Sequence, residues 1–166
     1  MRAEDFHNLY ERYASDVFRF AMYLCRNRAQ AEDITAETFV RVWTTSGEIR
    51  VATVKAYLLT IARNLYLSDL RWSVREVALE EAGQVPDYEG NLACHADQKA
   101  ALAHVLQALG QLKENDRVVL LMRAQDEMSY EQIAQALGLS TVAVKVRIHR
   151  ARLRLAELCQ RKEGRA

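Results

Sequence analysis

The stretch SYEQIAQALGLSTVAVKVRIHRARLRL, residues 129–155, decides how the C-terminal part of this chain folds. Ser129, with Gln132 three residues later, predicts a capping box at the start of a short helix. Gly138 can end that helix in a turn, and Ser140 can cap a second helix directly after it. The pattern therefore predicts two helices joined by a tight turn, that is, a helix-turn-helix.

The second helix of this pair has an apolar stripe and a basic opposite side. The stripe recurs at spacings of three to four residues, at Val144, Ile148, Ala151 and Leu155. Away from it fall Lys145, His149, Arg150 and Arg152. Between Gln132 and Ala156 there are five Lys or Arg residues and no Asp or Glu. A solvated face can have this composition, but the capped partner helix and glycine turn favour a helix that binds DNA phosphates and base edges.

The charge of the chain is unevenly distributed. Over its 166 residues, 23 Lys and Arg nearly balance 22 Asp and Glu. Residues 129–166 nevertheless carry a net charge of +5, and residues 73–98 carry −5. A basic end beside an acidic middle indicates a nucleic-acid partner.

Cysteine usage and hydropathy indicate a cytoplasmic protein. The three cysteines, Cys25, Cys94 and Cys159, are widely separated and share no CxxC spacing, as expected in a reducing compartment. Cys94 and His95 are adjacent, but two ligands do not make a metal site, so neither a metal nor a cofactor is expected. No apolar run approaches the length of a membrane span, and the N-terminus has no signal-peptide core, so no membrane insertion is expected.

The whole chain is predicted to be all-α, because no segment alternates with a period of two. A first helix is marked by apolar residues from Phe6 to Leu24, and further helices are expected at about 29–43, 54–72, 98–112 and 116–125. Residues 73–97 contain the only proline and an acidic excess, so they are predicted to be a flexible acidic linker. Two small helical domains, residues 1–72 and 98–166, are expected on either side of it.

The segment 29–43 has a distinctive outer face. Its predicted buried side is formed by Ala31, Ile34, Thr35, Thr38, Phe39 and Val42. The opposite side presents Asp33, Ala36, Glu37 and Val40. Asp33 and Glu37 are like charges four residues apart, which costs roughly a few tenths of a kcal/mol. A basic partner on this face would offset that cost, although simple solvation is the better explanation of this helix taken alone.

The segment 54–72 collects cations on its outer side. Its predicted buried residues are Val54, Leu58, Ile61, Ala62 and Leu65. The other side carries Thr60, Arg63, Asn64, Leu67 and Arg71, with the aromatic residues Tyr57, Tyr66 and Trp72 near it. Cations beside aromatic rings suit a single-stranded nucleic acid, whose bases stack while its phosphates pair. Aromatic residues at helical spacing are more often core. Asp69 is expected on the buried side, accepting hydrogen bonds or pairing with an arginine.

Taken together, these segments resemble the extracytoplasmic-function sigma factors of bacteria, over nearly the whole chain. AEDITAETFVRVW (31–43) is similar to that family's helix for core RNA polymerase, and AYLLTIARNLYLSDLRW (56–72) to its helix for the −10 promoter element. Residues 109–155 are similar to its −35-binding domain. The chain departs from the family at Ala36, where Gln is common, at Glu114, where Pro is frequent, and at Ala143 and Val146, where Thr and Ser are usual.

The resemblance implies a factor that binds core RNA polymerase and promoter DNA, is held inactive by an anti-sigma factor, and catalyses nothing itself. Contacts to the polymerase clamp would come from Asp33, Glu37 and Arg41. Backbone phosphates near −10 would be held by Arg63, Asn64 and Arg71, while loop 44–53 takes a flipped base. The −35 element would be contacted by Lys145, Val146, His149, Arg150 and Arg152. The acidic linker would enter the nucleic-acid channel of the polymerase.

Three other classes account for less of the sequence. A stand-alone helix-turn-helix regulator would leave the outer faces of 29–43 and 54–72 unused, and no dimerisation helix is evident. A sigma-like decoy that only binds an anti-sigma protein has no need of the basic helix. An enzyme is disfavoured because no Gly-rich phosphate loop, metal-ligand cluster or nucleophile–base pair is recognisable.

Overall fold

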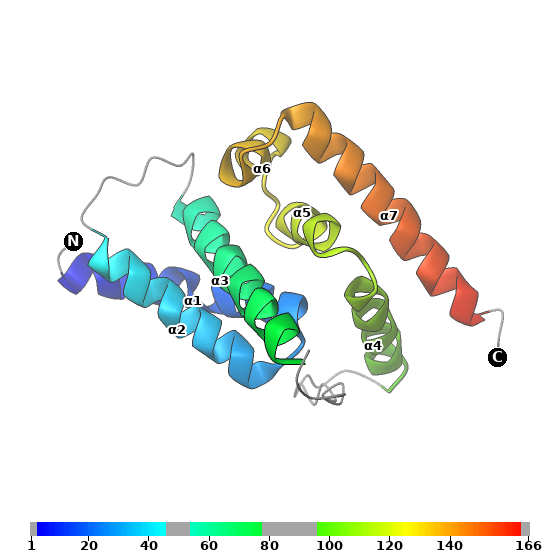
Figure 1. Cartoon of the computed structure of the whole chain (residues 1–166), viewed down its shortest axis with the longest axis horizontal. Coiled ribbons are helices and arrows are strands. Elements are labelled where there is room, and N and C mark those ends of the chain that lie inside the picture. Colours follow the sequence, from blue (N-terminus) through cyan, green and yellow to red (C-terminus); the bar gives the residue numbers. More distant parts are fainter. Residues whose placement is uncertain (1–2, 46–53, 78–95, 164–166) are drawn as a thin grey trace.

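The structure, a computed structural model, describes residues 3–45, 54–77 and 96–163. These residues form helices and no strand, which confirms the all-α prediction for the described part of the chain. In chain order the helices are α1 (Ala3–Cys25), α2 (Arg28–Thr44), α3 (Val54–Val77), α4 (Ala96–Gly110), α5 (Glu114–Ala124), α6 (Tyr130–Leu137) and α7 (Thr141–Glu163). An N-terminal domain of α1–α3 lies beside a C-terminal domain of α4–α7 (Figure 1).

Two helix ends differ from the expected positions. α3 runs to Val77, into the segment predicted as linker, and α4 already begins at Ala96. The start of the linker was predicted from the acidic excess, and acidic charge alone does not end a helix. Residues that do break helices come later, at Gly83 and Pro86. These two residues and most of the predicted linker, as well as 46–53 of the predicted flipped-base loop, lie outside the described residues.

The N-terminal domain packs three helices around a core that includes Phe20, Phe39 and Leu58, whose side chains are fully buried. α2 buries all six residues predicted from its pattern: Ala31, Ile34, Thr35, Thr38, Phe39 and Val42. The two threonines among them donate hydrogen bonds of 2.6 Å to backbone carbonyl oxygens one turn earlier, so their buried hydroxyls are satisfied. The prediction for this helix is therefore confirmed residue by residue.

The C-terminal domain is built around α5. Six consecutive residues of this helix are buried, from Arg117 to Met122, because neighbouring helices surround it. At the start of α6, the Ser129 hydroxyl accepts from the Gln132 N–H at 3.1 Å, and the Ser129 N–H donates to the Gln132 side chain at 2.8 Å. Gly138 ends α6 with a φ of 63°, a left-handed conformation that glycine adopts without strain. The predicted capping box and glycine turn are thus confirmed.

The two domains touch along one surface, which we call the domain contact. The Lys55 ammonium on α3 lies 2.9 Å from a carboxylate oxygen of Asp16 on α1 and 2.9 Å from one of Asp126, between α5 and α6. The Arg117 guanidinium on α5 donates to the Tyr66 hydroxyl on α3 at 2.8 Å. Both Arg117 and Tyr66 are buried. Charged and polar groups from both domains are therefore desolvated together.

Burial affects the two partners of the central ion pair differently. The Asp126 side chain is 0% exposed, and its burial raises the pKa of its carboxyl although Lys55 acts in the opposite sense. Burial alone would lower the pKa of Lys55, but pairing with Asp126 and Asp16 outweighs it and raises that pKa. Neither Asp126 oxygen has a well-directed hydrogen bond. The carboxylate is therefore held by the nearby ammonium charge.

α3 departs from its predicted pattern because it is covered on two sides. Tyr66, expected near the nucleic-acid face, is buried in the domain contact, and Leu59 is buried as well. Asp69, expected on the buried side, is instead exposed and accepts a 3.5 Å hydrogen bond from the Gln30 side chain. A single helical wheel assumes one buried face, whereas α3 packs against α1 and α2 on one side and α6 on another.

Candidate nucleic-acid interface

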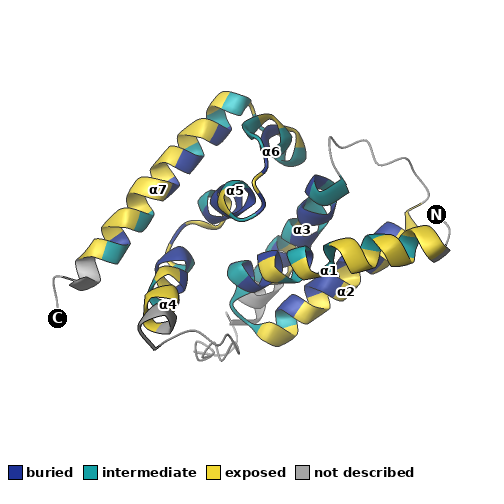
Figure 2. Cartoon of the chain, turned by 180° about the vertical axis from the view of Figure 1, so that it is seen from behind, coloured by how far each residue is buried: buried dark blue, intermediate teal, exposed yellow. Residues whose placement is uncertain are grey.

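α7 presents the basic side that its sequence pattern predicts. Val144, Ile148 and Ala151 are buried at 1% exposure or less, and the Ser140 hydroxyl caps the helix by accepting from the Ala143 N–H at 3.1 Å. The residues predicted to contact the −35 element, Lys145, Val146, His149, Arg150 and Arg152, are all exposed. Figure 2 shows this exposed surface running along most of the length of α7. The structure therefore gathers these side chains on one open face.

Tyr130 at the start of α6 was not singled out from the sequence. The Lys145 ammonium lies 5.5 Å from the centre of its ring, and the Arg123 guanidinium lies 4.9 Å from it. Arg123 also donates to the Met128 carbonyl at 2.8 Å, which connects it to the segment between α5 and α6. The Tyr130 ring thus orients Lys145 toward α6. The only signal in the sequence for this contact is the position of the tyrosine directly after the capping Ser129.

The predicted −10 residues lie on α3. Asn64 and Arg71 are exposed. Arg63 is partly buried. Its guanidinium donates to the Asn64 side chain at 3.1 Å and to Asn115 of the C-terminal domain at 3.3 Å. Burial first, and then the charges of Arg147 and Arg71, lower the pKa of Arg63. Cations from both domains therefore repel one another here, and an anion would relieve that repulsion.

The outer face of α2 is as predicted. Asp33, Glu37 and Arg41 are exposed, and the Arg41 guanidinium lies 2.9 Å from the Glu37 carboxylate. This pair offsets part of the repulsion between Asp33 and Glu37. Val40 and Trp43 add exposed apolar area, at 53% and 47%. The face thus combines carboxylates with uncovered apolar side chains.

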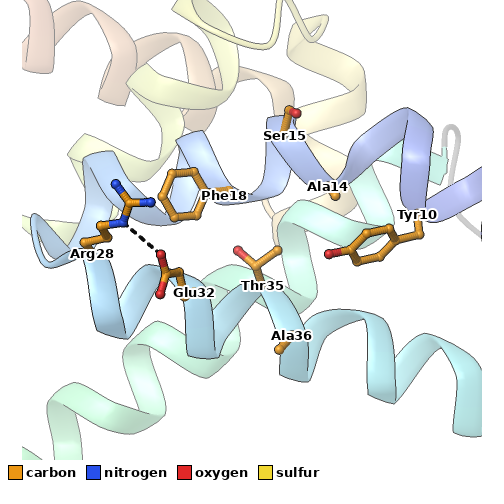
Figure 3. A pocket seen from close by; sticks show the side chains of 8 residues that line it. All are labelled: Tyr10, Ala14, Ser15, Phe18, Arg28, Glu32, Thr35 and Ala36. Atoms are coloured by element: carbon orange, nitrogen blue, oxygen red, sulfur yellow. Dashed lines mark hydrogen bonds and ion pairs between the residues drawn. The ribbon is translucent and has the colours of Figure 1, made fainter. Parts of the chain in front are cut away.

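A hollow of about 400 Å³ lies between α1 and α2, beside this face (Figure 3). It is lined by Tyr10, Ala14, Ser15, Phe18, Arg28, Glu32, Thr35 and Ala36. An ion pair of 2.8 Å between Arg28 and Glu32 lies at one end of it. Ala36 contributes only a methyl group to this lining.

The described residues show no group of three or more His, Cys, Asp or Glu side chains that could hold a metal ion. Burial raises the pKa of the Cys25 thiol, which favours the unreactive protonated form. Cys94 and His95 lie outside the described residues. Among the helices described, none is both long and apolar enough to cross a membrane.

Two family models match separate parts of the chain. The model described as Sigma-70 region 2 matches residues 9–75, and the model described as Sigma-70, region 4 matches residues 102–155. The first match falls on α1–α3 and the second on α4–α7.

Two similar proteins span nearly the same length as this chain. The ECF RNA polymerase sigma factor SigM of Bacillus subtilis is 28% identical, over 92% of this chain and 94% of its own. The ECF RNA polymerase sigma factor SigL of Mycobacterium tuberculosis is 30% identical, over 90% and 88%. The fold matches the sigma factor RpoE, solved in complex with the anti-sigma factor NepR from Bartonella quintana, with a TM-score of 0.76 and 28% identity. That match covers 95% of this chain and 98% of the other.

Proposed function

Since this chain belongs to the family of ECF RNA polymerase sigma factors, we propose that it binds core RNA polymerase and directs initiation at promoters whose −35 element is read by α7. The observation that carries the proposal is the open basic face of α7. The sequence from Gln132 to Ala156, which includes the first part of this helix, has five cations and no carboxylate. Such a face fits a phosphate-lined groove. The chain acts in the cytoplasm. It supplies sequence specificity to the polymerase and performs no catalysis of its own.

We assign the contacts as follows. Core polymerase is bound through the carboxylates of α2, at Asp33 and Glu37, together with Arg41. The −10 strand is held by Arg63, Asn64 and Arg71. The −35 duplex is contacted by Lys145, Val146, His149, Arg150 and Arg152. Two weak DNA-binding domains, 1–72 and 98–166, act together because core polymerase and the intervening linker give each a high effective concentration near its element.

The test of this function is promoter-directed initiation. Purified chain added to core RNA polymerase should create discrete start sites on genomic DNA fragments, mapped by primer extension. Core polymerase alone is the control. Identical start sites with and without the chain would contradict the proposal.

We predict that Lys145→Ala and Arg150→Ala weaken binding to a −35 duplex without unfolding the domain. Both side chains are exposed, and the buried stripe of α7 is untouched. Loss of a base-edge contact should cost about 1–3 kcal/mol and relax specificity at one position, whereas loss of a phosphate contact should weaken all sequences alike and reduce the salt slope by about 1. Fluorescence anisotropy at several salt concentrations measures both quantities.

The matched control is Arg154→Ala. Arg154 is exposed on the same helix but is paired with Glu157 at 3.0 Å and has no assigned DNA contact. Its variant should bind DNA nearly like the parent. If the Lys145 and Arg150 variants also bind like the parent, α7 is not the recognition helix.

An anti-sigma factor is the partner that we propose for regulation, because the solved relative that matches 95% of this chain is held by one. Such an inhibitor must cover faces that polymerase and DNA need. We predict that core polymerase titrated into a preformed inhibitor complex displaces the inhibitor, as measured by size-exclusion chromatography. A stable, inactive ternary complex would place inhibition at a different surface.

A further inference from the structure

Two valines on the outward side of α7 are exposed and do not belong to the apolar core. Val142 is 70% exposed and Val146 is 49% exposed. They are four residues apart, so they lie on the same side of the helix, about 6 Å apart along its axis. We propose that Val142 and Val146 contact thymine methyl groups in the major groove and thereby select thymine at the −35 element. This inference rests on the proposed function.

The side chains around the two valines favour duplex DNA as the partner of this surface. On the helical wheel Lys145 lies to one side of the valine pair and Arg150 to the other, and both are exposed. An apolar centre with cationic margins matches a groove whose base edges lie between two rows of phosphates. No carboxylate interrupts this side between Gln132 and Ala156. An apolar protein partner would leave the flanking cations unpaired.

The position of the valines along α7 places them where bases are read. α7 begins at Thr141, so both valines lie within its first two turns. In a helix-turn-helix the N-terminal residues of the second helix contact base edges. A valine cannot form a hydrogen bond there. The apolar feature of the major groove is the C5 methyl group of thymine, which a valine side chain can contact directly.

A single substitution tests each of the two positions. Serine can hydrogen-bond to several base edges, whereas Val146 can only make apolar contact. Replacement of Val146 by serine therefore removes the proposed apolar contact with little change in side-chain size. The matched change at the first valine is Val142→Ser.

The experiment removes single methyl groups from the DNA. A randomised duplex pool is selected on the full chain assembled with core RNA polymerase, and the selected −35 duplex is resynthesised with deoxyuridine at each thymine in turn. Loss of one contacted methyl should weaken binding about fourfold. In the Val146→Ser chain, binding should no longer weaken when one particular thymine is replaced by uracil. In the Val142→Ser chain the same should hold for a second thymine, which lies within about two base-pair steps of the first.

Leu153→Ser is the control, because Leu153 is 54% exposed on the same side of α7 but lies two turns beyond Val146. This variant should keep both uracil-sensitive positions. Equal binding of thymine and uracil duplexes by the parent would overturn the inference while leaving the proposed function intact, and so would losses that persist in both valine variants. Failure of the assembly to select any sequence would overturn the proposed function and the inference with it.

Discussion

Charge reversal at Asp33 and Glu37 should abolish association of the chain with core RNA polymerase. Both carboxylates are exposed on α2, and the buried side of that helix is untouched by the change. The introduced positive charges would face the basic groups that we expect on the polymerase. Like charges brought together in an interface cost several kcal/mol, so affinity for core polymerase should fall by roughly a hundredfold or more. Association is measured by titration of labelled chain with core polymerase, and folding by circular dichroism.

A control must carry the same change in net charge elsewhere. Glu11→Lys combined with Glu157→Lys meets this need, because these carboxylates are 66% and 61% exposed and lie on α1 and α7. The control should bind core nearly like the parent. If the Asp33 and Glu37 reversal leaves core affinity unchanged, the outer face of α2 is a solvated surface and the polymerase is bound elsewhere.

Replacement of Lys55 by methionine should separate the two domains at neutral pH. Methionine keeps much of the aliphatic length but removes the ammonium, leaving the Asp126 carboxylate buried without its cation. Removal of one partner of a buried pair costs about 3–5 kcal/mol, and the lower end applies because Lys55 keeps 25% of its side chain exposed. Small-angle scattering should report a larger radius of gyration than for the parent.

Docking of the two domains in the Lys55→Met chain should depend on pH. The pKa of Asp126 is raised in the folded state, so the docked form binds this proton more tightly, and its stability falls as pH rises above the ordinary carboxyl value. The Lys55→Met chain should therefore dock again near pH 4. The pKa of Lys55 is also raised, so in the parent its contribution is complete below its ordinary value of 10.5 and is lost above it.

A double variant, Lys55→Met with Asp126→Leu, is the control, because apolar residues of similar size replace a buried pair at little cost. It should remain docked from pH 4 to pH 7. A Lys55→Met chain that stays compact at pH 7 would show that the other groups of the domain contact suffice.

Local features of the fold were predictable because they depend on neighbours in sequence. The Ser129 capping box, the left-handed Gly138 and the inward side of α2 all follow from spacings of three or four residues. The exposure of the predicted −35 residues and of Asp33 follows from the same periodicity. Their roles in binding remain predictions.

What sequence reasoning missed depends on contacts between distant segments. Tyr66 was expected near an outer face, and only its pairing with Arg117 on α5 explains its burial. Arg117 itself is 5% exposed, which its charge would not suggest. The contact of Arg63 with Asn115 likewise joins two helices that no local pattern relates. Helical periodicity identifies a buried side but not the element that covers it.

The contact between Arg63 and Asn115 has a geometric consequence for promoter recognition. Elements centred near −10 and −35 are about 25 base pairs apart, or about 85 Å along B-form DNA. In the docked chain the α3 cation Arg63 is close enough to Arg147 on α7 for their charges to interact. A chain in this shape can span only a small part of that distance. Each promoter would then be bound only by the fraction of chains that has opened, and apparent affinity would be reduced by that fraction. Substitutions that loosen the domain contact would enlarge the open fraction. They would therefore raise the apparent affinity for every promoter by the same factor, without changing any contact to a base.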